Sequence, residues 1–267
     1  PILLNSPFED VALCEQSTST IAIDSTADTF QWEISTDGGT SWSIINEIAP
    51  YSGVTTSTLQ ITDLQLSFDN NLYRVFLQRA GNSCDDISNA ITLTVDTQPV
   101  IVTVPSDINR CDEDRAGFLD FDLITDQTPQ ILSGLDPSLD TTVFEVLYFD
   151  NLSDAELNTT SAIIANPYRV NTSLNPTIYA RVHNVNNTTC YSTVDFKLKV
   201  TDTPTPTQPT VYRICDDTAS GSDIDQKSLF LLNTKDAEIL ATVTNPGEYT
   251  ISYHTDLVDA QTSSTAN

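Results

Sequence analysis

The five cysteines are the residues whose types and spacing say most about the chemistry of this chain. Cys111 and Cys215 lie 104 residues apart, and each is followed by acidic residues. No Cys-x-x-Cys pair occurs, so the spacing typical of zinc and thioredoxin-type sites is missing. This 104-residue offset divides the chain into repeats of about one domain's length, two of them complete. One pair of cysteines falls in each complete repeat, which predicts the disulfides Cys14–Cys84 and Cys111–Cys190. Cys215 is then left without a partner within these 267 residues.

Paired cysteines in small domains indicate an oxidising, extracellular compartment. Each predicted disulfide closes a loop of roughly 70 to 80 residues and would stabilise its domain by on the order of 4 kcal/mol. The chain has no run of apolar residues long enough to span a bilayer and no basic segment followed by an apolar one. We therefore interpret it as an internal piece of a much longer protein, secreted to the cell surface without membrane insertion.

An acidic stretch that begins at Cys111 is the candidate metal site. Asp112, Glu113 and Asp114 bring three carboxylates together. Calcium is bound by six to eight oxygen atoms, so clustered carboxylates suit it. The stretch lacks the alternating aspartates and the distal glutamate of an EF-hand, and Arg115 lies within it. The alternative interpretation is a solvated turn that follows a structural cysteine.

Catalytic motifs are missing from the sequence. The two histidines, His183 and His254, lie in different repeats, and no nucleophile elbow, metalloprotease helix or phosphate-binding glycine loop occurs. We predict that the chain is not an enzyme. Two aromatic residues, Trp42 and Tyr51, are candidates for stacking against a sugar ring. Packing in a hydrophobic core is the alternative for both.

The strong negative charge limits the partners of the chain. It carries 37 acidic and 11 basic residues, a formal net charge of −26. Nucleic acids are bound by basic residues that neutralise phosphates, and anionic membranes are bound by basic surfaces. The composition therefore excludes both as partners. A field of this sign favours solubility, repulsion between neighbouring repeats and attraction of cations.

Short segments in which polar and apolar residues alternate predict β-strands along the chain. In the first repeat they cover residues 19–23, 30–34, 42–45, 59–61, 72–77 and 91–95. Asp37 and the two glycines that follow it favour a hairpin turn. Such evenly spaced strands are typical of a β-sandwich. With Trp32 on a central strand and Tyr73 in the place of the tyrosine corner, this repeat resembles an immunoglobulin-like domain, although Val75 stands where that family has its second cysteine.

Further landmarks recur at nearly the same offset as the cysteines. Eleven residues separate Tyr179 from Cys190, as they separate Tyr73 from Cys84. A fixed offset of this length indicates tandem domains. Helix is expected only as single turns, at 125–127 and 153–156. We predict an all-β array of immunoglobulin-like β-sandwich domains, like beads on a string with proline-rich linkers, with domains at 1–98 and 99–203 and a truncated copy of the second at 204–267.

Six motifs after residue 100 carry a family resemblance, namely Cys111–Asp114, Phe121–Leu123, Tyr148-Phe149, Asp154–Glu156, Ala165–Tyr168 and Ile178–Val182. They resemble repeats of very large cell-surface proteins of gliding Bacteroidetes, the SprB-like gliding-motility adhesins. The resemblance implies export by the type IX secretion system, anchoring at the outer surface and movement along the cell. It also implies O-glycosylation at short Asp-Ser/Thr patterns, which Ser25, Thr141 and Thr218 fit.

The resemblance and the composition together predict a non-catalytic segment of a large secreted adhesin, which builds an extended filament for surface adhesion and gliding motility. Its expected partners are a polysaccharide or a solid surface and, through other parts of the parent protein, the secretion and gliding machinery. A carbohydrate-binding module is the alternative, marked by exposed Trp42 and Tyr51 on a concave face. An accessory domain of an enzyme is a third interpretation.

Overall fold

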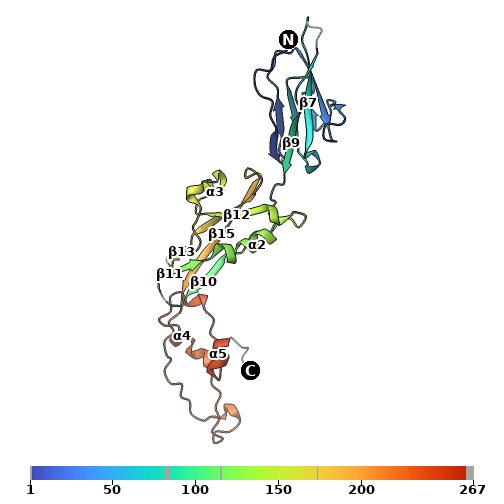
Figure 1. The fold of residues 1–267 in the computed structure, drawn as a ribbon. Helices are drawn as coiled ribbons and strands as arrows, with labels where there is room; N and C mark the ends of the chain where they lie inside the picture. Colours follow the sequence, from blue (N-terminus) through green and yellow to red (C-terminus); the bar gives the residue numbers. More distant parts are fainter. Residues whose placement is uncertain (1, 82–84, 115, 173, 263–267) are drawn as a thin grey trace. The chain divides into compact units, whose positions relative to one another are not determined.

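The computed structural model describes residues 2–81, 85–114, 116–172 and 174–262, and it consists mainly of β-strands with a few short helices (Figure 1). Its described residues fall into two compact units, one within Pro1–Arg110 and Ala116–Val200, the other within Cys111–Arg115 and Thr201–Asn267. The first unit contains two separate hydrophobic cores. We call the part around the first core, residues 2–96, the first domain, and the part around the second core, residues 101–202, the second domain.

The first domain is built from two sheets. Its strands are β1 (Val11–Cys14), β2 (Ser19–Ala22), β3 (Thr29–Ser35), β4 (Ser43–Ile44), β5 (Tyr51–Ser52), β6 (Thr58–Ile61), β7 (Asn71–Gln78), β8 (Asp86–Ile87) and β9 (Ile91–Asp96), with a 3-10 turn η1 (Leu66–Phe68). One sheet has the order β1-β9-β7-β3-β4, with β8 paired to β7, and the other has the order β2-β6-β5. Strands β1 and β9 run parallel, and the remaining pairs are antiparallel.

This sheet order is that of an immunoglobulin-like sandwich, in which three strands of one sheet face the larger sheet that carries the central tryptophan. Trp32 on β3 is fully buried, and its indole N–H donates to the Thr56 carbonyl at 2.8 Å. Tyr73 and Val75 on β7 are also fully buried. The predicted immunoglobulin-like fold is therefore confirmed, with Val75 packed in the core where other members of the fold place a cysteine.

The second domain repeats the same plan with fewer strands. These are β10 (Ile108–Asp112), β11 (Phe118–Phe121), β12 (Phe144–Phe149), β13 (Tyr168–Asn171), β14 (Thr177–Asn184) and β15 (Tyr191–Asp202). They form one sheet of order β10-β15-β14-β12 and a second sheet of β11 and β13. The sequence β1-β9-β7-β3 of the first domain thus corresponds to β10-β15-β14-β12 here, with the first strand of each domain beside its last strand.

Short helices connect these strands. They are α1 (Leu123–Asp126), α2 (Thr128–Ser133) and α3 (Leu152–Leu157), with 3-10 turns η2 (Thr141–Val143) and η3 (Thr160–Ala162). The side chain of Asp122 accepts a hydrogen bond from the backbone N–H of Thr125, and Asn151 accepts one from Ser153, so each residue caps the start of its helix. The two single turns predicted from the sequence are thus present as α1 and α3.

The described residues after the second domain, 203–262, contain no β-strand. They form the short turns η4 (Thr218–Ser220), η5 (Leu232–Lys235), α4 (Asp236–Ile239), η6 (Pro246–Glu248) and α5 (Leu257–Thr262). Large apolar side chains such as Ile224 and Leu229 are exposed there, at 84% and 68%. These described residues therefore form no β-sandwich.

None of the described helices is both long and apolar enough to cross a membrane.

Candidate functional site

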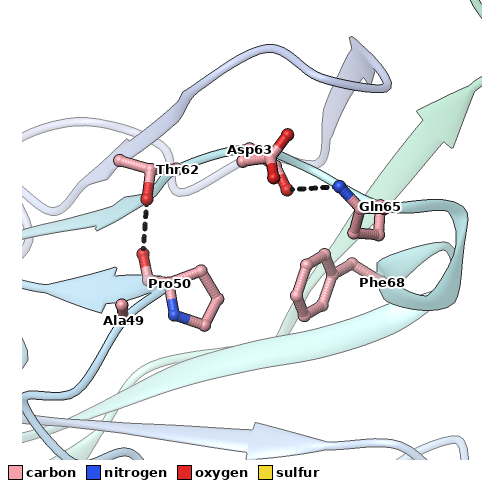
Figure 2. A pocket seen from close by; sticks show the side chains of 6 residues that line it. All are labelled: Ala49, Pro50, Thr62, Asp63, Gln65 and Phe68. Carbon is pink, nitrogen blue, oxygen red and sulfur yellow. Dashed lines mark hydrogen bonds between the residues drawn. The ribbon is translucent and has the colours of Figure 1, made fainter.

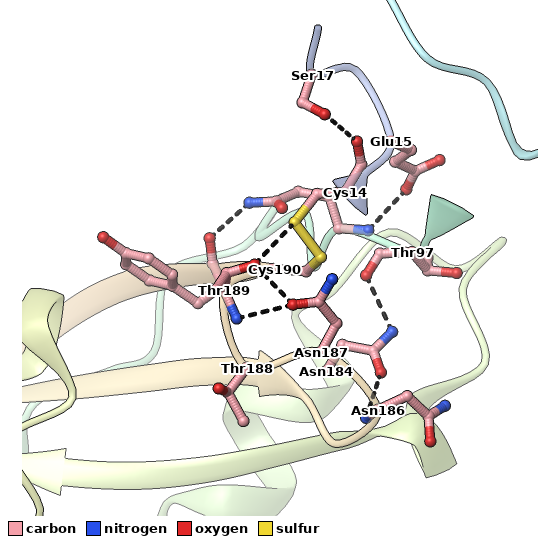
Figure 3. Close-up of a disulfide and its surroundings, with 12 residues drawn as sticks. Cys14, Glu15, Ser17, Thr97, Asn184, Asn186, Asn187, Thr188, Thr189 and Cys190 are labelled. Atoms are coloured by element: carbon pink, nitrogen blue, oxygen red, sulfur yellow. Dashed lines mark hydrogen bonds between the residues drawn. A yellow bond between two sulfur atoms is a disulfide. The ribbon is translucent and has the colours of Figure 1, made fainter. Parts of the chain in front are cut away.

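A disulfide joins the first domain to the second (Figure 3). Cys14 is the last residue of β1 and lies opposite Asp96, the last residue of β9. Cys190 directly precedes β15, in the loop that follows β14. The two Cα atoms are 5.3 Å apart, although 176 positions separate the cysteines in the sequence. The bond therefore closes a covalent loop that runs through both domains.

The predicted pairings Cys14–Cys84 and Cys111–Cys190 are wrong. Cys84 lies outside the described residues. The Sγ atom of Cys111 lies 3.5 Å from the hydroxyl of Thr201, near the end of the 12-residue strand β15, whereas Cys190 precedes its beginning. At about 3.3 Å per residue the strand separates these two positions by roughly 35 Å, and a disulfide requires Cα atoms within about 7 Å. Cys111 and Cys215 both carry free, exposed thiols.

Hydrogen bonds at the start of the linker reinforce the disulfide (Figure 3). The backbone N–H of Gln98 donates to the carboxylate of Glu15, next to Cys14, at 2.9 Å. Three more bonds connect the linker to the second domain: Asn184 Nδ2 to the Thr97 carbonyl at 3.2 Å, Gln98 Nε2 to the Tyr191 carbonyl at 2.5 Å, and Ser192 Oγ to the Pro99 carbonyl at 2.5 Å. Each contributes about 1 kcal/mol, so the disulfide remains the strongest constraint at this junction.

The loop that carries Cys190 is a hydrogen-bonded turn. The side-chain oxygen of Asn187 accepts bonds from the backbone N–H and the hydroxyl of Thr189, at 3.2 and 2.6 Å. The backbone N–H of Cys190 donates to the Asn187 carbonyl, and the Cys190 carbonyl accepts from Asn184, both at 2.9 Å. Cys190 is fully buried. These bonds fix the backbone of the turn on both sides of Cys190.

Arg181 on β14 is hydrogen-bonded to this turn. The side chain is buried, at 3% exposure, and its guanidinium lies 3.5 Å over the ring of Tyr191. One nitrogen donates to the carbonyls of Ala155 and Glu156 at the end of α3, at 2.8 and 2.9 Å, and another donates to the Thr188 carbonyl at 2.6 Å. Burial lowers the pKa of the guanidinium, and Tyr191 opposes that shift. Arg181 therefore ties α3 to the loop that carries Cys190.

Sequence reasoning used Arg181 only as a landmark of the repeat and missed this role. A charged residue within a strand of buried residues was the available signal, because a buried arginine requires several acceptors. The side chains from Ala180 to Asn184 are all buried in the structure. An arginine in such a run therefore needs several nearby acceptors.

His183, two residues further along β14, is also buried, at 3% exposure. Its Nε2 atom lies 3.4 Å from a carboxylate oxygen of Glu145 on β12. Burial lowers the pKa of His183 below the ordinary value of 6.5, which outweighs the opposing attraction of Glu145, and the nearby Arg181 lowers it further. The neutral imidazole is thus the form that the folded domain favours.

We expect the stability of the second domain to fall as the pH falls below neutral. A histidine with a lowered folded-state pKa contributes stability that is fully present above the unfolded-state pKa of about 6.5, and this contribution is lost as the pH falls through the folded-state value. The free energy of unfolding should decrease from pH 7.5 to pH 5.5, and His183→Gln should flatten this slope. Urea denaturation at several pH values measures both. A slope that His183→Gln leaves unchanged would assign the effect to another group.

The candidate calcium site is not assembled. No group of three or more acidic, histidine or cysteine side chains suited to a metal ion occurs among the described residues. The side chain of Asp112 is buried, whereas Glu113 and Asp114 are exposed. The Asp112 carbonyl accepts a hydrogen bond from the hydroxyl of Thr203 at 2.7 Å. The acidic stretch therefore forms a turn at the end of β10 instead of a cluster of ligands.

Trp42 and Tyr51 do not form one stacking platform. The ring of Trp42 is covered by the guanidinium of Arg74 at 4.0 Å, and Arg74 also pairs with Glu33. The hydroxyl of Tyr51 lies 3.4 Å from that of the buried Tyr73. A shallow hollow of about 280 Å³ includes Tyr51, and another of about 430 Å³ is lined by Ala49, Pro50, Thr62, Asp63, Gln65 and Phe68 (Figure 2). Trp42 lines neither of them.

The three predicted O-glycosylation residues differ in accessibility. Thr141 and Thr218 are exposed, whereas Ser25 is half-buried. The aspartates that precede the two threonines, Asp140 and Asp217, each accept a hydrogen bond from the backbone N–H two residues further on, at 2.9 Å. Both threonines therefore lie at the beginning of a capped surface turn.

Two family models match the chain. Residues 107–205 match the model described as the Flavobacterium inter-domain disulphide bond domain, and residues 6–97 match a domain of unknown function, DUF8696. The first description agrees with the bond between Cys14 and Cys190. This match and the immunoglobulin-like repeats suggest a protein of the Bacteroidetes. Neither description is of an enzyme, and no curated protein matched the sequence.

Solved structures with similarity to the chain include several tandem immunoglobulin proteins. A structure that explains Dscam isoform specificity is 13% identical over 75% of this chain and 46% of that chain, with a TM-score of 0.32. Titin A168169 is 10% identical over 75% of this chain and 99% of that chain, with a TM-score of 0.31. Rst D1-D2 is 13% identical over the same two shares, with a TM-score of 0.32. The aligned part thus spans less than half of the Dscam chain.

The fold assignment rests on the sheet order of the two domains. The disulfide and the inter-domain disulphide family match both suggest an extracellular protein, because such bonds persist in oxidising compartments. The chain is therefore an array of immunoglobulin-like β-sandwich domains in which a disulfide joins two consecutive domains.

Proposed function

We propose that this chain is a mechanical segment of a secreted cell-surface adhesin. In this role the Cys14–Cys190 disulfide restricts hinge motion between consecutive domains and prevents their unfolding under force. The inter-domain disulfide is the observation that supports this proposal most strongly. A disulfide within one domain would stabilise that domain alone. A disulfide between domains adds a second covalent connection beside the linker, and two connections restrict hinge motion far more than one.

The parent protein in this proposal belongs to the SprB-like gliding-motility adhesins, is exported by the type IX secretion system and forms a filament on the outer surface. Adhesion to a polysaccharide or a solid surface would then load the filament whenever the cell moves. The net charge of −26 supports an extended arrangement, because neighbouring segments repel each other. The separate hydrophobic cores of the first and second domains fit a serial array of independently packed units.

Joint tumbling of the first and second domains is the expected result for the oxidised protein. Backbone ¹⁵N relaxation should give one rotational correlation time for both domains, because the disulfide and the linker bonds fix their junction. In Cys14→Ser, the two domains should show shorter, unequal correlation times. Cys215→Ser removes a cysteine that forms no disulfide and serves as the control. Equal correlation times in Cys14→Ser and the unmutated chain would contradict the proposed restraint.

A further inference from the structure

The hollow of about 430 Å³ lies beside the small sheet of the first domain (Figure 2). Pro50 directly precedes β5, Thr62 and Asp63 directly follow β6, and Phe68 ends η1. We call this space the Phe68 hollow. Figure 2 shows the rings of Pro50 and Phe68 on opposite sides of it, with Thr62, Asp63 and Gln65 along the rim above them. Two rings and a polar rim therefore border the same open space.

Hydrogen bonds and ring packing hold the walls of the Phe68 hollow in place. The backbone N–H and the hydroxyl of Thr62 both donate to the Pro50 carbonyl, at 3.0 and 3.2 Å. The backbone N–H of Phe68 donates to the Gln65 carbonyl at 2.9 Å. The Phe68 ring also packs edge-on against Tyr51, with the ring centroids 6.2 Å apart. The hollow is thus preformed, so a ligand loses little affinity by ordering it.

The rim of the Phe68 hollow offers hydrogen-bond acceptors to solvent. Thr62, Asp63 and Gln65 are all exposed. The amide nitrogen of Gln65 donates to the backbone carbonyl of Asp63 at 3.1 Å. Among the described residues, no hydrogen bond engages the carboxylate of Asp63. A ligand that carries hydrogen-bond donors can therefore bind this rim while it covers the two rings.

The hollow of about 280 Å³ adjoins the Phe68 hollow and shares Ala49 and Pro50 with it. Two of its lining residues, Ile44 and Ile48, are 61% and 70% exposed. Exposed apolar side chains that gather beside a few polar groups are typical of binding sites. Two adjoining hollows suit a chain of linked units better than one small molecule.

We propose that the Phe68 hollow binds a neutral polysaccharide, with one sugar ring between Pro50 and Phe68 and a sugar hydroxyl donating to the carboxylate of Asp63. A pyranose meets both demands of the lining, because its C–H groups form an apolar face and its hydroxyls donate hydrogen bonds. An apolar side chain would instead cover the Asp63 carboxylate without supplying a donor, which is unfavourable. This inference rests on the proposed function, and it names the class of ligand and the residues that contact it.

The charges around the two hollows favour a neutral polysaccharide over an acidic one. Asp63 lies on the rim of the first hollow, and Glu47 directly precedes Ile48 of the second. No basic residue is among the described residues that line either hollow. The whole chain carries a formal net charge of −26. A carboxylated or sulfated sugar would therefore be repelled.

NMR titration of the oxidised 267-residue chain tests this inference. The probes are hexasaccharides of three neutral polysaccharides, a β-1,3-glucan, an α-1,6-glucan and a β-1,4-mannan, with an alginate hexasaccharide as the acidic counterpart. At least one neutral probe should shift the backbone amide signals of residues 62–68 at concentrations up to about 10 mM, and alginate should not. The inference is wrong if no neutral probe shifts these signals, or if alginate shifts them equally.

Two substitutions identify the residues that contact the sugar. Phe68→Ala removes one ring and Asp63→Asn removes the charged acceptor, and each should weaken binding of the neutral probe by about tenfold. Asparagine tolerates the positive φ of 52° at position 63, so this second variant keeps the test valid if Phe68→Ala fails to fold. Unchanged affinity in Asp63→Asn would overturn the inference.

Trp42→Ala is the matched control, because Trp42 lines neither hollow, and it should bind the neutral probe as the unmutated chain does. A loss of binding in Trp42→Ala equal to that in Phe68→Ala would place the sugar elsewhere and contradict the inference. Failure of this inference leaves the proposed function standing, since the correlation times of Cys14→Ser test the role of the disulfide separately.

Discussion

Pulled by its two ends, the oxidised protein should extend by about 600 Å less than the reduced protein when both domains unfold. The disulfide encloses 176 residue steps between Cys14 and Cys190, and an extended chain spans about 3.4 Å per residue. Tension applied at the ends passes from Cys14 through the sulfur atoms to Cys190. The enclosed residues, which include nearly all of both cores, therefore bear no load.

Optical-tweezer extension of the oxidised chain, compared with the double variant Cys14→Ser with Cys190→Ser, measures this effect. The variant should show the full contour length under both oxidising and reducing conditions. The double variant Cys111→Ser with Cys215→Ser removes the two free thiols of the described residues and should keep the shortened length. On the chain-entropy model a loop of this size also stabilises the protein by about 5 kcal/mol. Equal lengths for the oxidised chain and the Cys14/Cys190 variant would exclude a load-bearing role.

Replacement of Arg181 should have the second-largest effect, a loss of about 3 kcal/mol in the free energy of unfolding of the second domain. Arg181→Met keeps much of the side-chain volume but leaves the carbonyls of Ala155, Glu156 and Thr188 without their charged donor. Bonds of this kind contribute more than neutral ones, and the loss is partly offset because a buried cation is no longer desolvated. Urea denaturation followed by circular dichroism measures the change.

Arg169→Met is the matched control for this prediction. Arg169 lies in the same domain and pairs with Asp120 at 2.8 Å, but its side chain is 59% exposed, so its removal should cost less than about 1 kcal/mol. A second measurement separates the turn from general stability. Because Arg181 holds the Thr188 carbonyl two residues before Cys190, Arg181→Met should make the disulfide easier to reduce with dithiothreitol under native conditions, and Arg169→Met should not. Equal losses in the two variants would refute the assigned role.

Much of the fold followed from local patterns. Alternation along residues 72–77 placed Tyr73, Val75 and Leu77 on the buried face of β7, because neighbouring side chains of a strand point to opposite faces. Trp32 was likewise predicted on a central strand, and in the structure its strand β3 lies between β7 and β4. The strand predicted at residues 42–45 is shorter in the structure. There β4 contains only Ser43 and Ile44, because only these two residues pair with β3 at the edge of the sheet.

The disulfide could not be predicted from spacing. The distance from Cys14 to Cys84 and that from Cys111 to Cys190 fit a bond within each domain as well as a bond between domains, and sequence alone does not give connectivity. The end of the strand at which each cysteine lies decides between these pairings. Cys111 lies at the far end of β15 from Cys190, whereas Cys14 lies at the end of its domain where the linker begins. Such placement depends on the register of strands distant in sequence.

A tryptic map of the oxidised chain under non-reducing conditions tests the central claim most directly. Trypsin places each cysteine in a different peptide, namely 1–74, 80–110, 111–115, 182–197 and 214–227. The structure predicts one linked pair, 1–74 with 182–197, which separates into its two peptides on reduction. Peptide 1–74 linked to 80–110, together with 111–115 linked to 182–197, would place the bonds within each domain and contradict the inter-domain disulfide.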